Sequence, residues 1–226
     1  MKVLERIFFD RFAEEFLESK YRNLLKYLRL VSCLFFLSCM LLYFIVSGVA
    51  ILRYLTLETF LLNAIYFTLS FLCYFFKSLK PVCYILFEII WALNCVVTLA
   101  YWSYLSDYSY EASEVMGSII PHSTPFFMTL LDFFLNQVKF YRVHYIFPGL
   151  FLFFYSVCVL MPYTLAVGTV YPGITFDSWF TYVFLAGFTL FGLVSLEIGK
   201  IIKEKCFCFK VNNEDKDRSI SLSLNK

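Results

Sequence analysis

The amino-acid sequence predicts an all-α protein, a polytopic transmembrane helical bundle of about six spans. Hydrophobic residues make up 61% of its 226 residues and aromatic residues 22%, and the mean hydropathy is +0.73. Long apolar runs recur along the chain, and a spanning helix needs about 20 mostly apolar residues. Lys and Arg residues fall almost entirely in alternate gaps between these runs. Because basic residues collect on the cytoplasmic side of a membrane, this alternation predicts an even number of spans.

The predicted spans follow one another with little chain left between them. Each carries at most two Asp, Glu, Lys, Arg or His side chains. The runs cover residues 30–52, 59–76, 81–105, 115–138, 145–176 and 178–199. Since no linker, second domain or internal repeat is found, one compact bundle accounts for nearly the whole chain.

The basic residues predict the orientation of the bundle. Of the 19 Lys and Arg residues, 18 lie before residue 30, at 77–80, at 139–142 or from residue 200 onward. The gaps at 103–121 and 169–177 hold none. The remaining basic residue, Arg53, lies in the gap between the runs 30–52 and 59–76, on the side expected to face away from the cytoplasm. We therefore expect both the N- and C-termini to be cytoplasmic.

The two ends of the chain are predicted to lie outside the six-span domain of residues 30–202. Residues 1–29 form a predicted amphipathic cytoplasmic helix, which either lies on the membrane surface or packs on the inner ends of the bundle. Residues 203–226 are predicted to be a disordered cytoplasmic tail, because they are polar. Cys206 and Cys208 begin this tail among basic residues and are candidates for acylation. A zinc site is disfavoured there, since stable sites have four ligands.

Ionisable residues inside predicted spans are costly and therefore suggest function. Glu88 and Asp132 each lie about 10 Å along the helix from the inner end of their run, at a shared depth. No Lys or Arg is expected at that depth, so each carboxyl should be protonated, hydrogen-bonded to a polar side chain or wetted by a cavity. Hydrogen bonding between helices is favoured over proton transport. Glu197 is expected to pair with Lys200 at the inner interface.

Thr56 and His122 are predicted to lie together near the outer boundary. Thr56 precedes Lys77 by about 31 Å of helix, and His122 precedes Lys139 by about 25 Å. Both are expected near helix N-termini, where unpaired N–H groups could stabilise an oxyanion. A hydroxyl, an imidazole and N–H donors are the parts of an ester hydrolase. Spacing alone favours the alternatives, in which Thr56 caps a helix and His122 is a boundary residue. His144 is expected a bilayer away from His122, so the two cannot share a metal.

Short motifs along residues 30–200 resemble, in their order, the androgen-induced and rolling stone family of six-span membrane proteins. The motifs are Arg53-Tyr-Leu-Thr-Leu-Glu58, Val97-Thr-Leu-Ala-Tyr-Trp102, Leu130-Leu-Asp-Phe-Phe-Leu135, His144-Tyr-Ile-Phe-Pro148, Val170-Tyr-Pro172 and Asp177-Ser-Trp179. His122, ten residues before Asp132, is similar to the rolling stone branch.

The two branches of this family imply different functions. The androgen-induced branch implies hydrolysis of fatty acid esters of hydroxy fatty acids by a threonine nucleophile and a histidine, which by motif position would be Thr56 and His122. The rolling stone branch implies a role in muscle-cell fusion without catalysis. Pro121 stands where the hydrolase branch has Asn, a second His shortly after His122 is missing, and Pro125 occupies the next turn.

We therefore expect a multi-pass protein of the endoplasmic reticulum or plasma membrane that hydrolyses lipid esters. The alternative is a non-catalytic adaptor or cell-fusion factor. The expected mechanism needs no metal or organic cofactor, and the expected partners are membrane lipids rather than nucleic acid. A transporter built on Glu88 and Asp132 is disfavoured, because the Gly/Pro-interrupted half-helices of many transporters are missing.

Overall fold

The computed structural model describes residues 21–105 and 112–224, with side chains over 21–104 and 118–205. The part of the chain described is helical and contains no strand, which confirms the all-α prediction. The α-helices are α2 (Arg22–Ser47), α3 (Leu55–Leu72), α4 (Lys80–Ala100), α5 (Ala112–Leu135), α6 (Ile146–Phe154), α7 (Met161–Ala166) and α8 (Trp179–Leu224). Short 3₁₀ segments are η2 (Val49–Arg53), η3 (Lys77–Leu79) and η6 (Arg142–Tyr145), and π-helical segments are η4 (Tyr101–Leu105) and η7 (Tyr155–Leu160).

The helices have the length and composition of a multi-pass membrane protein. Among the described residues, five segments are long and apolar enough to cross a membrane. They are Arg22–Ser47, Leu55–Leu72, Lys77–Tyr104, Arg142–Ala166 and Trp179–Lys205. Helix α5 is not among the five, because polar side chains and two prolines lower its hydropathy. The sixth span therefore stays a prediction.

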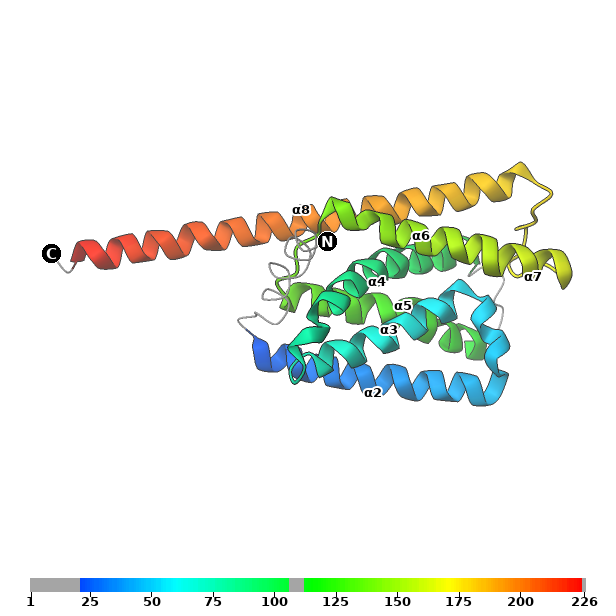
Figure 1. The fold of residues 1–226 in the computed structure, drawn as a ribbon, viewed down its shortest axis with the longest axis horizontal. Helices are drawn as coiled ribbons and strands as arrows, with labels where there is room; N and C mark the ends of the chain where they lie inside the picture. The colour runs from blue at the N-terminus through cyan, green and yellow to red at the C-terminus, as the bar shows by residue number, and fades with distance from the viewer. Residues whose placement is uncertain (1–20, 106–111, 225–226) are drawn as a thin grey trace.

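The long helices lie side by side and alternate in direction, as Figure 1 shows. Helix α4 is central and packs against α3, α5, α6 and α8, while α2 packs against α3 and α5. We call the end where α2 begins and η3 lies the η3 end, and the opposite end the η2 end. Helix α8 runs back from the η2 end and passes the η3 end (Figure 1).

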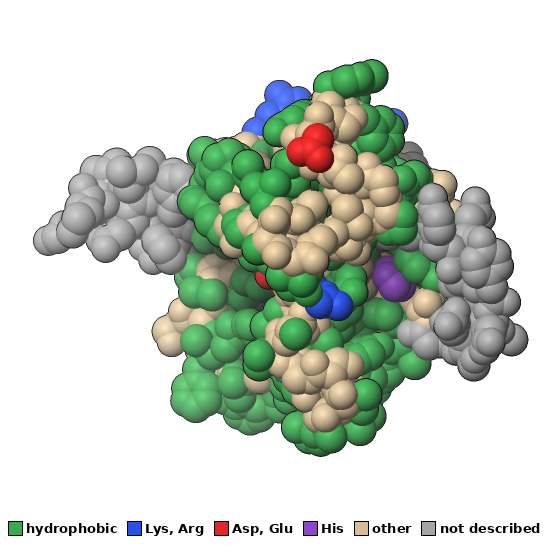
Figure 2. Space-filling view, turned by 90° about the vertical axis from the view of Figure 1, so that its right-hand side faces the viewer, with side chains coloured by type: hydrophobic (Ala, Val, Ile, Leu, Met, Phe, Trp, Pro, Cys, Tyr) green, Lys and Arg blue, Asp and Glu red, His purple; other side chains and the backbone are tan. Residues whose placement is uncertain are grey.

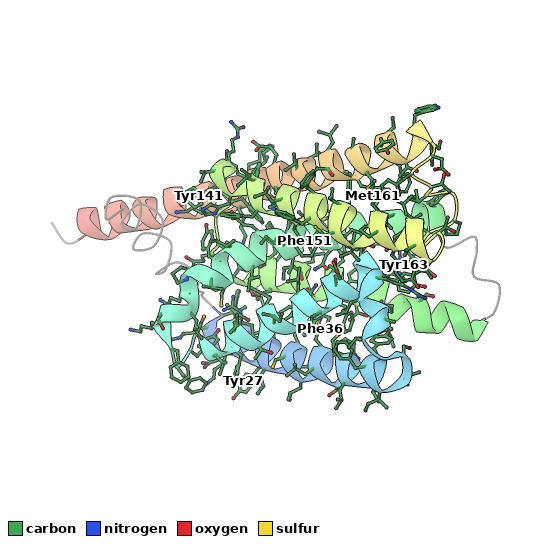
Figure 3. The ribbon with its side chains drawn as sticks, turned by 45° about the vertical axis from the view of Figure 1, so that its right-hand side comes forward. Tyr27, Phe36, Tyr141, Phe151, Met161 and Tyr163 are labelled. Atoms are coloured by element: carbon green, nitrogen blue, oxygen red, sulfur yellow. The ribbon has the colours of Figure 1, made fainter. Side chains whose placement is uncertain are left out.

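Aromatic side chains fill the core between α2, α3, α4 and α5. The Phe36 ring of α2 lies 4.8 Å from Phe60 and 5.4 Å from Phe67, both on α3. Trp91 of α4 stacks on Phe133 of α5 with ring centroids 4.4 Å apart. Figure 3 shows Phe36 between α2 and α3, and Tyr27 on the far side of α2. That far side is exposed and apolar, as expected for a helix in contact with lipid.

The first and last long helices extend beyond the predicted limits of the membrane domain. Helix α2 begins at Arg22, so residues 22–29 belong to the first long helix; residues 1–20 lie outside the described part. Helix α8 continues to Leu224, whereas residues 203–226 were expected to be disordered. No Gly or Pro interrupts this polar segment, and polarity alone does not end a helix. The side chains of Cys206 and Cys208 lie outside those described, so their acylation stays a prediction.

Candidate functional site

An apolar cavity lies towards the η2 end, between α3, α4, η7 and α8. It holds about 690 Å³ of space free of protein atoms, including its open mouth. Both π-helical segments contribute to its wall, and such segments are frequent at functional sites. Its apolar lining consists of Leu55, Val96, Val97, Ala100, Leu152, Leu160, Ile174, Phe184, Leu185 and Phe188. The polar side chains in the wall are Thr56, Tyr104, Tyr155, Ser156, Tyr171 and Thr189.

The Thr56 hydroxyl differs in its hydrogen bonding from the two other aliphatic hydroxyls in this wall, those of Ser156 and Thr189. The Ser156 hydroxyl donates to the Leu152 carbonyl at 2.8 Å, and the Thr189 hydroxyl donates to the Leu185 carbonyl at 2.9 Å. Both are therefore occupied by their own helices. The Thr56 hydroxyl makes no hydrogen bond to any residue that the structure describes.

Two tyrosines, not Thr56, accept the first backbone N–H of α3. The N-cap residue is Tyr54, whose side chain makes no capping hydrogen bond. Instead, the Leu55 N–H donates to the Tyr171 hydroxyl at 2.8 Å and to the Tyr155 hydroxyl at 3.0 Å. Thr56 is thus the second residue of the helix, and the alternative that it caps the helix is wrong. It lies in the first turn and lines the cavity.

The two phenols form a short hydrogen-bonded chain at the cavity wall. The Tyr155 hydroxyl donates to the Arg53 carbonyl at 2.8 Å and lies 3.2 Å from the Tyr171 hydroxyl. A phenol has one proton to donate. Tyr171 must therefore donate either to Tyr155 or to a ligand in the cavity. Sequence reasoning missed both roles; the only signal was Tyr171 in the motif Val170-Tyr-Pro172.

His122 lies on α5, outside the cavity wall. Its Nδ1 atom is 2.7 Å from the Ser118 carbonyl, and its ring stacks on Tyr101 with centroids 3.6 Å apart. Because a carbonyl only accepts, Nδ1 carries the proton and Nε2 is left as an acceptor. Helix α5 begins at Ala112, so the expectation that His122 lies at a helix N-terminus is wrong, and the helix dipole acts only over the first turn. Helix α5 is continuous through both prolines.

A polar layer in mid-bundle relates the depths of Thr56 and His122. Asn63 of α3 and Asn94 of α4 exchange amide hydrogen bonds of 2.9 and 3.1 Å. The Thr129 hydroxyl of α5 lies 2.8 Å from Asn94 and 3.1 Å from Asn63.

Thr56 lies seven residues before Asn63 on α3, and His122 lies seven residues before Thr129 on α5, in both cases towards the η2 end. Seven residues make two helical turns, about 10 Å, so the two side chains share a level, as predicted from spacing. However, no hydrogen bond joins Thr56 to His122 in the described structure. The two side chains therefore share a level without being joined by a hydrogen bond.

Asp132 is paired with an arginine, contrary to expectation. Arg29 Nη2 lies 3.1 Å from Asp132 Oδ1, and both side chains are fully buried. The Tyr66 hydroxyl also donates to Asp132. The expectation that no basic residue reaches this depth is wrong because α2 begins at Arg22, which places Arg29 two turns inside the bundle. Asp132 therefore belongs to a buried network joining α2, α3 and α5.

Glu88 has a different partner, so the two intramembrane acids do not meet. Glu88 Oε2 lies 2.6 Å from His144 Nδ1, and Oε1 accepts the Tyr141 N–H at 3.0 Å. These bonds fix the chain between α5 and α6 against α4. His144 lies in η6 at the η3 end, whereas His122 lies towards the η2 end on α5.

Glu197 lies in an ion-pair cluster at the η3 end. It lies 3.8 Å from Lys200, the expected partner, but Arg142 is closer at 2.6 Å. Within the described residues, no group of three or more His, Cys, Asp or Glu side chains could hold a metal ion.

Comparison with known proteins gives no match to a protein-family model, a curated protein or a solved structure. The resemblance to the androgen-induced and rolling stone family therefore stays a hypothesis that rests on short motifs. The function has to be inferred from the cavity and the groups in its wall.

Proposed function

We propose that the protein is a six-span membrane protein that binds a lipid acyl chain in the apolar cavity and hydrolyses its ester at Thr56. One observation carries this proposal: Thr56 lines the cavity, and its hydroxyl, unlike those of Ser156 and Thr189, has no hydrogen-bond partner among the described residues. An apolar cavity with a few placed polar groups is the usual form of a small-molecule site.

In the proposed reaction, the Thr56 oxygen attacks the acyl carbonyl carbon and His122 Nε2 takes the hydroxyl proton. Tyr171 can turn its O–H from Tyr155 towards the carbonyl oxygen and stabilise the negative charge that forms there. The tetrahedral intermediate then expels the alcohol, which takes the proton from His122. Water hydrolyses the acyl-threonine in a second step.

Proton transfer requires the base to come within about 3 Å of the hydroxyl. In this structure, the His122 ring is stacked on Tyr101 instead. Substrate binding must therefore move α5 relative to α3, or turn the ring out of its stack. Helix α5 is suited to such a movement, because two prolines weaken its internal hydrogen bonding.

A covalent probe tests the nucleophile directly. We expect a lipophilic fluorophosphonate to label the wild-type protein in membranes, with the adduct on the peptide containing Thr56 by mass spectrometry. Thr68→Ala is the matched control, because Thr68 lies on the same helix and its hydroxyl donates to the Ala64 carbonyl at 2.7 Å. Labelling should persist in Thr68→Ala and disappear in Thr56→Ala. Equal labelling of both variants would refute the role of Thr56.

We also propose that the η3 end of the bundle faces the cytoplasm. Cys introduced at Glu111 should react with a membrane-impermeant maleimide added outside the membrane, whereas Cys introduced at Lys77 should react only after permeabilisation. The reason is that basic residues gather at the η3 end. Reaction of the Glu111→Cys variant from the cytoplasmic side alone would overturn the six-span map.

A non-catalytic membrane adaptor or fusion factor is the second candidate. The missing hydrogen bond between Thr56 and His122 in the described structure favours it, as does the close stacking of His122 on Tyr101. An adaptor would show no labelling at Thr56 while still binding lipid.

A further inference from the structure

Arg53 occupies an unusual position for a basic residue of this chain. It ends η2, at the end of the bundle opposite the other basic clusters. Its guanidinium lies between two aromatic rings, with Cζ 4.9 Å from the centroids of both Tyr54 and Tyr163. Figure 3 shows Tyr163 of α7 beside the start of α3. The rings hold the guanidinium in place through cation–π contact.

The hydrogen bonds of Arg53 leave most of its donors unused. Nη2 donates to the Tyr54 hydroxyl at 3.0 Å, and Nη1 donates to the Tyr163 hydroxyl. Nε is buried and has no partner among the described residues. A guanidinium offers five N–H donors, and each phenol keeps its own O–H proton. The cluster therefore presents several donors and few competing acceptors.

The guanidinium of Arg53 has no carboxylate partner among the side chains that the structure describes. Arg53 forms no ion pair with any residue that the structure describes. The hydrogen bond to Tyr54 raises the pKa of Arg53 above its ordinary value, so the guanidinium stays charged. A partly buried cation without a carboxylate partner attracts an anion.

A pocket opens directly beside this charge. It holds about 360 Å³ of space free of protein atoms, including open solvent. Its lining consists of Arg53, Tyr54, Tyr163, Val167, Gly168, Thr169 and Val170, and we call it the Arg53 pocket. Figure 2 looks at this end and shows a small patch of basic side-chain surface near the middle of a largely apolar face, with acidic surface to its left and above it.

The Arg53 pocket borders the apolar cavity along two segments of chain. Tyr54 lines the pocket, and the next two residues, Leu55 and Thr56, line the cavity. In the same way, Val170 lines the pocket and Tyr171 lines the cavity. A molecule with a charged end and an apolar chain could therefore occupy both.

We propose that the Arg53 pocket binds the anionic headgroup, a carboxylate or a phosphate, of a lipid whose acyl chain lies in the adjoining cavity. This inference rests on the proposed binding of an acyl chain there and names the class of lipid. Arg53 and the two phenols supply donors to the anion, while the cavity supplies the apolar surface. The headgroup would fix where along the chain Thr56 meets the lipid.

The test measures binding rather than hydrolysis. Purified protein in neutral detergent is titrated with oleic acid, lysophosphatidic acid and oleyl alcohol, which differ in headgroup and share an 18-carbon chain. We expect at least one anionic lipid to bind about tenfold more tightly than the alcohol, since a hydrogen bond to a charged group is worth about that factor. Whichever acid shows the greater preference identifies the headgroup as carboxylate or phosphate.

Arg53→Gln should abolish this preference and leave the affinity for oleyl alcohol unchanged, which also shows that the variant is folded. Arg142→Gln is the matched control, because Arg142 is an exposed arginine at the opposite end. It should keep the preference.

Three results would overturn the inference. The first is equal affinity of the wild-type protein for the acids and the alcohol. The second is a preference that survives in Arg53→Gln. The third is displacement of bound oleic acid by millimolar inorganic phosphate, which has no acyl chain. That result would indicate a site for a free anion. Fluorophosphonate labelling of Thr56 in Arg53→Gln separates the two proposals, because it reports the hydroxyl of Thr56 and not the headgroup.

Discussion

Arg29→Ala is expected to lower the free energy of unfolding by about 3–5 kcal/mol, because it leaves the Asp132 carboxylate buried without its cation. Both side chains of this pair have an exposed fraction of 0%. In lipid or detergent, no water reaches the carboxylate to replace the guanidinium. The loss is measured by reversible unfolding in mixed micelles, followed by circular dichroism.

An exposed ion pair supplies the control for this prediction. Arg142 and Glu197 are 72% and 32% exposed, so Arg142→Ala should cost less than about 1 kcal/mol. The double variant Arg29→Met with Asp132→Leu should recover most of the stability, since replacing both charges leaves neither one unpaired. The interpretation fails if Arg29→Ala costs no more than Arg142→Ala.

Thr56→Ala is expected to reduce lipid-ester hydrolysis by about a thousandfold or more, to near the background rate, because removing a nucleophile abolishes the covalent route. His122→Ala should have a similar effect. The double variant should be little worse than either single variant, since residues that act as one unit are not additive. The measurement is release of fatty acid from a long-chain ester by purified protein.

Conservative substitution separates chemistry from packing in this series. Thr56→Ser keeps a hydroxyl and should retain part of the rate, while Thr68→Ala should retain all of it. Because the hydroxyl of Thr56 makes no hydrogen bond to a described residue, Thr56→Ala should not unfold the protein. A full rate in Thr56→Ala would exclude Thr56 as the nucleophile and favour the adaptor.

The helices, and the depth of each side chain along the bundle, could be predicted from this sequence. The residues that each side chain contacts could not. Apolar runs give the helices directly, and the constant rise of a helix places Thr56 and His122 at one level. Rotation about the helix axis decides what each side chain faces, and packing sets that rotation. Spacing therefore could not show that Thr56 lines a cavity while His122 stacks on Tyr101.

The missed contacts are the ones that join distant parts of the chain. Arg29 and Asp132 are 103 residues apart, and Arg29 was assigned to a cytoplasmic segment because it is charged. The Leu55 N–H is capped by Tyr155 and Tyr171, which lie 100 and 116 residues further along. No local capping signal marks these tyrosines, because a tyrosine in an apolar run is equally expected at a lipid-facing or core position.

The layer of Asn63, Asn94 and Thr129 divides the bundle into halves with different tolerance to change. Below it, towards the η3 end, ion pairs and stacked rings make most substitutions costly to folding. Above it, the apolar cavity leaves space beside some of its wall residues, so these side chains can vary in size while the fold persists. Most of the residues that would set ligand preference thus differ from those of the buried ion pairs, although Tyr155 and Tyr171 both line the cavity and cap α3. A chain built this way can acquire a new lipid preference by substitutions near the η2 end without first gaining stability elsewhere.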